Sequence, residues 1–346
     1  MNNLSEIEET YSKRNRQSML LLIGIMGLLG MATLVATPLG SASLGIADVV
    51  EVFLSKIPFL DTEADKYDTA IVWENRLPRI IMAIVAGFGF ALSGTAMQGV
   101  LRNPLASPFT LGISSAACFG GALAMLLGAD MVDNGKFIVM ASAFLFGIGA
   151  LLLIYGISRR RGASPETVIL CGIALMYMFM AMTSAISMGG MLSFLLMGSL
   201  LDSDWEDVLV VFIPIMVILP LLMRRSWDMN ALALGDDVAQ GVGVDLKRVR
   251  LTAIVYATVI VSIIVSFTGL IGFVCLVSPY IARRLMGNDH RFIFPCAGFL
   301  GALMLLSTDT LARTMVESVE IPVALLTTII GVPFLIYLAL SRKEWA

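Results

Sequence analysis

The sequence has little charge, one histidine and four cysteines, and each shortage excludes a class of protein. Charged residues make up 14% of the 346 residues, whereas hydrophobic residues make up 58%. This balance excludes a soluble globular domain and a disordered chain. The net charge of -3 provides no basic excess of the kind that indicates a nucleic-acid partner. We therefore expect a membrane protein with several crossings.

Potential metal ligands are too few and too scattered to indicate a site. The four cysteines stand alone in apolar runs, at Cys118, Cys171, Cys275 and Cys296. With His290 as the single histidine, we expect no metal, no cofactor bound by this chain and no disulfide framework. The 22 methionines include an alternating series from Met176 to Met182. Residues two apart do not share a helix face, so we interpret this series as packing rather than a metal relay.

Charge-free apolar runs predict an all-α protein with about ten membrane-spanning helices, since ~20 residues of helix cross a bilayer core. Two runs exceed one crossing. Run 167–201 is broken at Gly189-Gly190, and run 251–282 is expected to form crossings at about 250–268 and 271–285. The remaining runs are 17–47, 80–101, 103–129, 137–158, 208–223, 292–308 and 321–341.

The distribution of basic residues places both termini in the cytoplasm. Seventeen of the 23 lysines and arginines fall on the side of the polar N-terminal tail, 1–18, as the positive-inside rule requires. The apolar run after this tail has no cleavage site, so we interpret it as a retained first helix. The six exceptions on the outer side are Lys56, Lys66, Arg76, Arg79, Lys136 and Arg313.

Three of these exceptions lie at predicted helix ends, where the rule disfavours them. Arg76 and Arg79 flank Leu77-Pro78 and project from one side of a helix start, and Arg313 ends a later run. A cation opposes the dipole at a helix N-terminus, so capping does not explain the pair. Two interpretations remain open: interfacial anchoring by snorkelling, or a basic socket for an acidic partner outside the membrane.

The connection at 230–250 is the longest on the inner side and the only one with an amphipathic helical pattern. Asp236-Asp237 follow Gly235 and open a short helix, in which Val238 and Val242 share a face. Two short helices separated by glycines, with apolar groups facing the cytoplasm, indicate a docking surface. A loop folded on its own protein is the alternative.

Motifs along nearly the whole chain resemble the FecCD-like permease subunits of bacterial type II ABC importers, which serve iron-siderophore, haem and cobalamin uptake. The motifs are RLPR at 76–79, SGTAMQ at 93–98, RNPLASP at 102–108, LG at 111–112, LALG and GVGV within 232–244, GLIGF at 269–273, PYIAR at 279–283, NDHR at 288–291, DTLAR at 309–313 and EIPVALLTTIIGVPFLIYL at 320–338.

The resemblance implies a single transmembrane permease domain, 1–346, in the bacterial cytoplasmic (inner) membrane. It implies a homodimer or close heterodimer enclosing the translocation path. Two ABC ATPase subunits, which carry ATP and Mg, bind on the inner side, and a periplasmic or lipid-anchored binding protein delivers substrate outside. Arg76, Arg79 and Arg313 then receive acidic residues of that binding protein. The chain has no G-x-x-x-x-G-K-[ST] motif, so we expect a transport subunit without an ATPase site.

The resemblance also assigns residues to the inner face and the path. The coupling element, about 228–248, fits the ATPase subunit through Leu234, Gly235, Asp236, Asp237, Val238, Gly241 and Gly243. The translocation path and gate are assigned to Met97, Gln98, Asn103, Pro104, Ser164, Pro165 and Glu166. An inverted repeat is expected to relate helices two to five with helices seven to ten, since both halves begin with small-residue-rich spans and continue with Pro-broken turns.

Departures from the family pattern favour an iron-siderophore as cargo. Cys275 stands where glycine is usual, and Tyr280 stands where the family often has histidine, which removes a haem ligand. Pro165-Glu166 replaces the small hydroxyl pair of a cobalamin-type gate. Cobalamin or haem remains the alternative cargo. An ion-coupled transporter, a membrane enzyme or a channel is disfavoured, because such proteins place charged or polar clusters in mid-membrane and Asp309 is the only acid near it.

Overall fold

The computed structural model describes residues 2–40, 44–56, 64–132, 135–161, 165–187, 197–315 and 321–340, and within these ranges it contains helices and no strand. The elements in chain order are α1 (Asn2–Ala36), α2 (Ile46–Ser55), α3 (Lys66–Thr69), the π-helix η1 (Ala70–Arg76), α4 (Leu77–Leu101), α5 (Ile113–Leu126), the 3-10 helix η2 (Ala129–Met131), α6 (Gly135–Arg161), α7 (Pro165–Ile186), α9 (Trp205–Arg224), α10 (Ser226–Ala233), α11 (Asp236–Gly241), α12 (Leu246–Thr268), α13 (Val274–Met286), α14 (His290–Thr314) and α15 (Val323–Leu340).

Ten of these helices account for the predicted crossings. Among the described residues, seven helices are long and apolar enough to span a membrane: α1, the continuous helix that contains α4, α6, α7, α9, α12 and α14. Three are shorter: α5 with 14 residues, α13 with 13 and α15 with 18. The irregular stretch before α13, at 269–272, is buried, as backbone at membrane depth must be when it is not helical. The all-α fold is confirmed.

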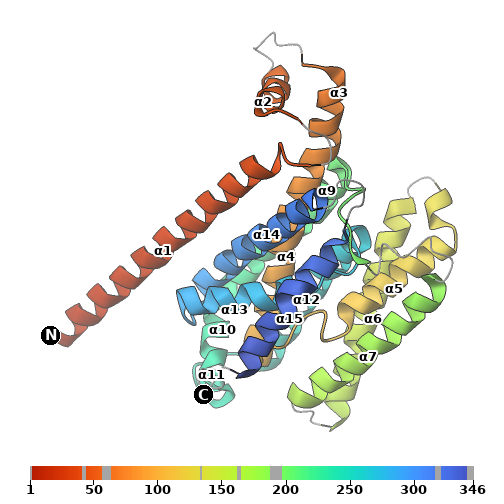
Figure 1. The fold of residues 1–346 in the computed structure, drawn as a ribbon. Coiled ribbons are helices and arrows are strands. Elements are labelled where there is room, and N and C mark those ends of the chain that lie inside the picture. Colours follow the sequence, from red (N-terminus) through yellow and green to blue (C-terminus); the bar gives the residue numbers. More distant parts are fainter. Residues whose placement is uncertain are drawn as a thin grey trace.

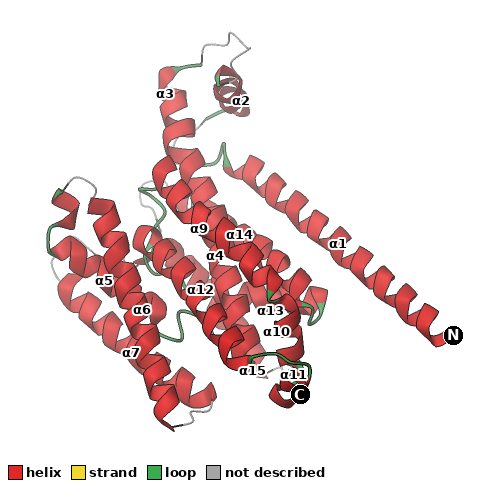
Figure 2. Ribbon diagram, turned by 180° about the vertical axis from the view of Figure 1, so that it is seen from behind, coloured by secondary structure: helices red, strands yellow, loops and turns green. Residues whose placement is uncertain are grey.

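The helices form one bundle with two distinct ends (Figures 1 and 2). α2 and α3 stand at one end, and α10 and α11 stand at the opposite end. Following the predicted topology, we call these the outer end and the inner end. Both views place α5, α6 and α7 on the opposite side of the bundle from α1.

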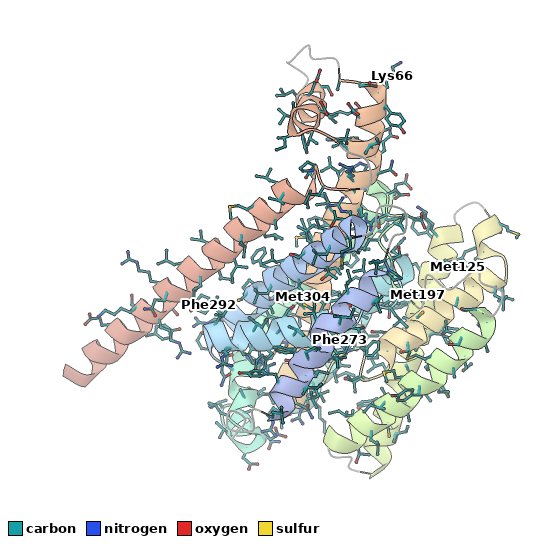
Figure 3. The ribbon with its side chains drawn as sticks, viewed as in Figure 1. Lys66, Met125, Met197, Phe273, Phe292 and Met304 are labelled. Carbon is teal, nitrogen blue, oxygen red and sulfur yellow. The ribbon has the colours of Figure 1, made fainter. Side chains whose placement is uncertain are left out.

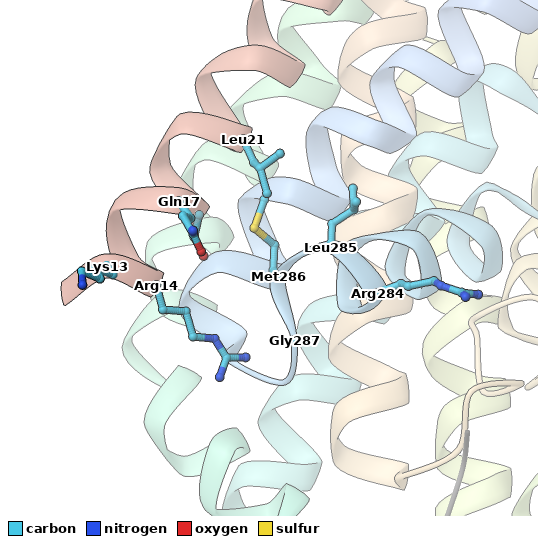
Figure 4. Close-up of a pocket in the computed structure, with 9 residues that line it drawn as sticks. Lys13, Arg14, Gln17, Leu21, Arg284, Leu285, Met286 and Gly287 are labelled. Atoms are coloured by element: carbon cyan, nitrogen blue, oxygen red, sulfur yellow. The ribbon is translucent and has the colours of Figure 1, made fainter. Parts of the chain in front are cut away.

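α1 lies along the outside of the bundle, and only 11% of its apolar span is buried. The helix begins at Asn2, so the predicted polar tail is the first part of α1. Near the inner end it meets the turn between α13 and α14 at a pocket of ≈ 540 Å³. Arg14 points to this turn, whereas Lys13 and Arg284 point away, so the positive charges of the pocket do not converge (Figure 4). Gly287, at φ 75°, leaves room for Arg14, because a Cβ there would overlap its guanidinium.

α4 is the central helix of the bundle, and 89% of the apolar span that contains it is buried. Its small residues permit the close backbone approach predicted from the sequence. A Cβ at Gly87 would lie 2.8 Å from the carbonyl carbon of Gly301 in α14 and closer still to its oxygen. A Cβ at Gly94 would lie 2.7 Å from the carbonyl carbon of Cys275 in α13. Neither glycine can be replaced without moving a neighbouring backbone.

The two halves of the chain repeat the same order of helix lengths. α4, α5, α6 and α7 have 25, 14, 27 and 22 residues, and α12, α13, α14 and α15 have 23, 13, 25 and 18. Each short second helix follows a break with left-handed residues, Arg102 and Gly112 in the first half and Gly269 and Phe273 in the second. α4 runs from the outer end to the inner end and α12 runs the opposite way (Figure 1), as an inverted repeat requires.

Phe273 closes the second of these breaks. Its ring lies beside α15 (Figure 3), where Gly331 leaves the space that the ring occupies. A positive φ of 67° is costly for a residue with a large side chain. The packing of the ring against α15 offsets this cost and fixes the entry into α13.

Replacing Gly87 by alanine should loosen the contact between α4 and α14. The added Cβ meets backbone rather than a flexible side chain, so we expect a cost of ~1–3 kcal/mol from overpacking. Thermal unfolding of the detergent-solubilised protein measures this as a lowered midpoint. Gly149→Ala in α6 is the control, because no atom lies within 4 Å of its added Cβ. Equal midpoints for the two variants would contradict the close contact.

Candidate docking and translocation sites

The three outer arginines lie together at the outer end, on the elements that the sequence predicted. Arg76 is the last residue of η1, Arg79 is in the first turn of α4 and Arg313 is in the last turn of α14. Pro78 lacks a backbone N–H, and the wider π-helical turns come directly before it. In these turns the Asn75 side chain donates to the Ala70 carbonyl at 3.1 Å, five residues back.

Asp309 joins two of these arginines inside the bundle. The Arg79 Nε and Nη2 atoms each lie 2.9 Å from Asp309 Oδ1. Arg313 Nε lies 3.7 Å from Asp309 Oδ2. The Asp309 carboxylate is completely buried. A carboxylate in α14 thus offsets the charge of a guanidinium from α4 and of one from its own helix.

The last residue of α1 and the two residues after it supply acceptors to the same cluster. Arg76 Nη1 donates to the carbonyls of Thr37 at 3.2 Å and Pro38 at 2.9 Å, and Arg313 Nη2 donates to Ala36 at 2.6 Å. Cations are favoured at a helix C-terminus, where carbonyl groups lack helical partners. These bonds fix the outer end of α1, which is otherwise loosely packed.

The three arginines of the expected basic socket are buried. Arg76 and Arg79 are 7% exposed and Arg313 is 6% exposed. The three side chains converge as expected, but their charged groups face the interior. The docking of an acidic partner on them stays a prediction, and it requires the partner to compete with carbonyls of α1.

At the inner end, α10 and α11 present an apolar surface. The expected short helix after Gly235 is α11, and Gly235 itself has φ 121°, which favours glycine. Four large apolar side chains are exposed here: Trp227 61%, Leu234 74%, Val238 48% and Val242 68%. We call these four residues the inner apolar surface. Gly241 ends α11, and Gly243, at φ 86°, turns the chain toward α12.

Asp236 anchors this surface to the bundle, while Asp237 is exposed. Arg250 Nη2 of α12 lies 2.8 and 2.9 Å from the two Asp236 oxygens, and Arg102 Nη2 at the end of α4 lies 3.1 Å from Oδ1. The two arginines hold α11 against the inner ends of α4 and α12.

The predicted path and gate residues separate into three groups. Met97 and Gln98 lie inside α4, at 0% and 1% exposure, and face neighbouring helices. Asn103 accepts a hydrogen bond from the Leu105 backbone at 2.8 Å, which places Asn103 and Pro104 in the turn beside the Arg102–Asp236 pair. Pro165 is the first residue of α7 and Glu166 the second. Ser164 lies outside the described residues.

α7 has one long face that no described residue covers. Leu170 is 68% exposed, Tyr177 65%, Met178 45% and Met182 40%, at spacings that share a helix face. We call this the open face of α7. Met176 and Met180 are partly buried instead, as expected for residues that do not share a face with Met178. The opposite side of α7 packs on α5, where Gly172 and Gly112 meet closely.

Within the described residues no three His, Cys, Asp or Glu side chains come together in a group that could hold a metal ion. Tyr280, at the position where a haem ligand was considered, is buried and contacts Phe334 edge-on, with ring centroids 5.2 Å apart.

The arrangement defines a polytopic permease, and the comparisons with known proteins give its family. The FecCD transport family matches residues 27–341, and the chain belongs to this family of ABC importer permeases. A chain described as a metal-chelate type ABC transporter in an inward-facing conformation has the same fold, with a TM-score of 0.79 and 31% identity. The match covers 93% of this chain and 99% of that chain.

Relatives in the family carry different cargo names. The molybdate import permease of Haemophilus influenzae is 32% identical and matches 94% of this chain and 96% of its own length. The Fe(3+)-citrate import permease of Bacillus subtilis is 35% identical, with 78% of this chain and 81% of the relative covered. The hemin transport permease of Yersinia pestis is 34% identical, with 79% and 84% covered.

Sequence reasoning missed the carboxylates that organise the outer end. Asp309 and Arg313 are four residues apart, a spacing that places both on one helix face and signals an ion pair. Lys136 at the start of α6 lies 2.5 Å from Asp204 and 3.0 Å from Asp207 at the start of α9, a contact for which the sequence carries no local signal.

Replacing Asp309 by asparagine should strongly destabilise the outer end. Arg79 and Arg313 then share a buried site without that carboxylate, which we expect to cost ~3–5 kcal/mol. The measurement is the thermal midpoint in detergent. Glu9→Gln is the control: it breaks the exposed pair of Glu9 with Lys13, for which we expect ~0–1 kcal/mol. A midpoint of Asp309→Asn equal to that of the control would reject the role of Asp309 as counter-ion.

Proposed function

We propose that this chain is the permease subunit that carries an iron-siderophore complex across a bacterial inner membrane, driven by ATP hydrolysis on separate subunits. The observation that carries the proposal is geometric. A member of the FecCD family presents an arginine cluster at one end of the buried α4–α14 pair and the inner apolar surface at the other end. These are the two contacts that an importer needs, one with the protein that brings cargo and one with the protein that supplies energy.

The inner apolar surface is the proposed seat of the ATPase subunit. Trp227, Leu234, Val238 and Val242 expose apolar area on two short helices that Asp236 holds to α4 and α12. Exposed apolar side chains on a rigid support favour a protein partner. Movement of the ATPase subunits then reaches α4 and α12 through Asp236.

The arginine cluster is the proposed contact for the binding protein. Carboxylates on two lobes of that protein would replace the carbonyls of Thr37, Pro38 and Ala36 as acceptors of Arg76 and Arg313. An exchange of neutral for charged acceptors strengthens each hydrogen bond. The exchange also releases the outer end of α1.

A second permease copy is the proposed partner of the open face of α7. The face is apolar and contains Tyr177, Met178 and Met182, and its exposed residues from 170 to 185 are uncharged. Two copies, identical or closely related, that bring these faces together would enclose a path lined by apolar side chains, with Glu166 near its inner end. Such a path suits a bulky complex whose charges are already neutralised by chelation.

The proposed cargo is a ferric chelate. The relatives' cargo names include molybdate, Fe(3+)-citrate and hemin, and the structural neighbour is described as a metal-chelate type transporter. The buried Tyr280 offers no imidazole to haem iron. These points favour a ferric chelate, with haem or cobalamin as the alternative cargo.

Reconstitution tests the function directly. The chain is incorporated in liposomes with its partner ATPase and binding protein, and ATP-dependent uptake is measured for ferric citrate, a ferric hydroxamate, hemin, cobalamin and molybdate. We expect uptake of a ferric chelate that requires both partners. Preferred uptake of hemin, cobalamin or molybdate would overturn the cargo. Uptake that follows an ion gradient without ATP would overturn the class of transporter.

Changing Leu234 to aspartate should detach the ATPase. The side chain is 74% exposed, so the substitution leaves the fold intact while placing a charge in the proposed interface. We expect the ratio of ATPase subunit to permease after purification to fall at least ~tenfold, as for a central interface residue. Ile46→Asp, in α2 at 74% exposure, is the matched control at the outer end. Full retention of the ATPase by the Leu234 variant would count against the docking site.

A further inference from the structure

A polar network of Asn230, Asp289 and His290 joins α10 to the start of α14. Asn230 in α10 uses both ends of its carboxamide. Its Oδ1 accepts from the His290 backbone N–H at 2.8 Å, and its Nδ2 donates to Asp289 Oδ1 at 3.0 Å. The same Oδ1 lies 2.8 Å from His290 Nδ1, and since a carbonyl oxygen only accepts, Nδ1 carries the hydrogen. All three bonds join α10 to the start of α14.

Asp289 stays ionised in this network. Burial raises the pKa of Asp289, but hydrogen bonds from Arg291 and Asn230 outweigh burial and hold the pKa below its usual range. Its charge strengthens the bond from Asn230. Arg291 adds a second contact to α10, because its guanidinium carbon lies 4.4 Å from the centre of the Trp227 ring. Trp227 and Asn230 are three residues apart, so α10 is held at two points on one face.

His290 extends the network to α4. The imidazole is 3% exposed, and a Cβ at Gly99 would lie 2.7 Å from its Nε2 atom. The ring therefore rests on the α4 backbone. Pro295 interrupts the hydrogen bonding of α14 just above this point, but the contact at Gly99 bypasses it.

From the contact of His290 with Gly99, α4 and α14 stay packed together as far as the arginine cluster. The backbones touch at Gly87 and Gly301, and Arg79 meets Asp309 beyond them. α14 alone has 25 residues, a length of ~37 Å at ~1.5 Å per residue. A displacement of α10 that is passed to His290 is thus applied to the base of a rigid pair whose far end holds the arginines.

We propose that Asn230 is a positioning residue that ties α10 to the α4–α14 pair, so that binding-protein contact outside and ATPase movement inside are coupled through this pair. The inference rests on the proposed function, since it needs an ATPase on the inner apolar surface. Loss of the Asn230 side chain should uncouple the outer end of the α4–α14 pair from the ATPase at the inner end.

The experiment measures ATP hydrolysis by the reconstituted complex with and without binding protein, loaded with whichever of the five cargo probes supports wild-type uptake. In Asn230→Ala we expect the ratio of stimulated to unstimulated hydrolysis to fall at least ~fivefold, with uptake per ATP falling similarly. Arg225→Gln is the control, because it breaks the Arg225–Asp228 pair at the start of α10 and leaves α14 untouched. A ratio within ~twofold of wild type for Asn230→Ala overturns the proposal.

A second pair of variants separates a loss of coupling from misfolding. Asn230→Asp places two carboxylates together, and adding Asp289→Asn restores a donor and an acceptor in exchanged positions. We expect the double variant to regain stimulation that Asn230→Asp loses, with equal amounts of assembled complex in both. No recovery in the double variant contradicts the coupling role. If the wild-type complex shows no stimulation at all, the proposed function fails instead, so the two failures are distinguished.

Discussion

The contact between α4 and α14 is the constraint on which the rest of the structure depends. Membrane helices gain little hydrophobic energy from associating, so close backbone packing must supply the attraction. Glycine at 87 and 301 allows it. Gly87 lies eight positions after Arg79, and Gly301 lies eight positions before Asp309, so in two antiparallel helices this one contact places Arg79 opposite Asp309. The same register places Gly99 against His290 at the other end.

The buried charges at the outer end fix the alignment of the helices more than they stabilise the fold. Removing a guanidinium and a carboxylate from water costs several kcal/mol, and their attraction repays this only approximately. What the pair of Arg79 and Asp309 adds is a penalty for any other alignment, since a shifted α14 would leave a charge buried alone. The bonds from Arg76 and Arg313 to α1 extend this selection to a third helix that has little other packing.

The sequence was sufficient for the crossings because a bilayer imposes length and the absence of charge on each helix. It also brought Arg76, Arg79 and Arg313 to one end, since topology alone sorts helix ends. It could not predict that these arginines would be buried, because burial depends on Asp309 and on carbonyls of α1 that are distant in sequence. Met97 and Gln98 are buried within this chain, and their assignment to the path stays a prediction. The network of Asn230 and His290 had no local signal either.

The contrast between α4 and α7 decides where movement is permitted. α4 is enclosed on all sides, and its glycines interlock with α13 and α14, so sliding it would drive backbone into backbone. α7 is held mainly through α5 and leaves an apolar face uncovered, which lipid or a second copy can cover with little difference in solvation. A change in the width of a path at that face therefore breaks no contact at the face itself, whereas a movement of α5 and α6 with α7 is resisted where they pack on α12. Rigid coupling along α4–α14 and compliance at α7 are consequences of where the glycines and the uncovered side chains fall.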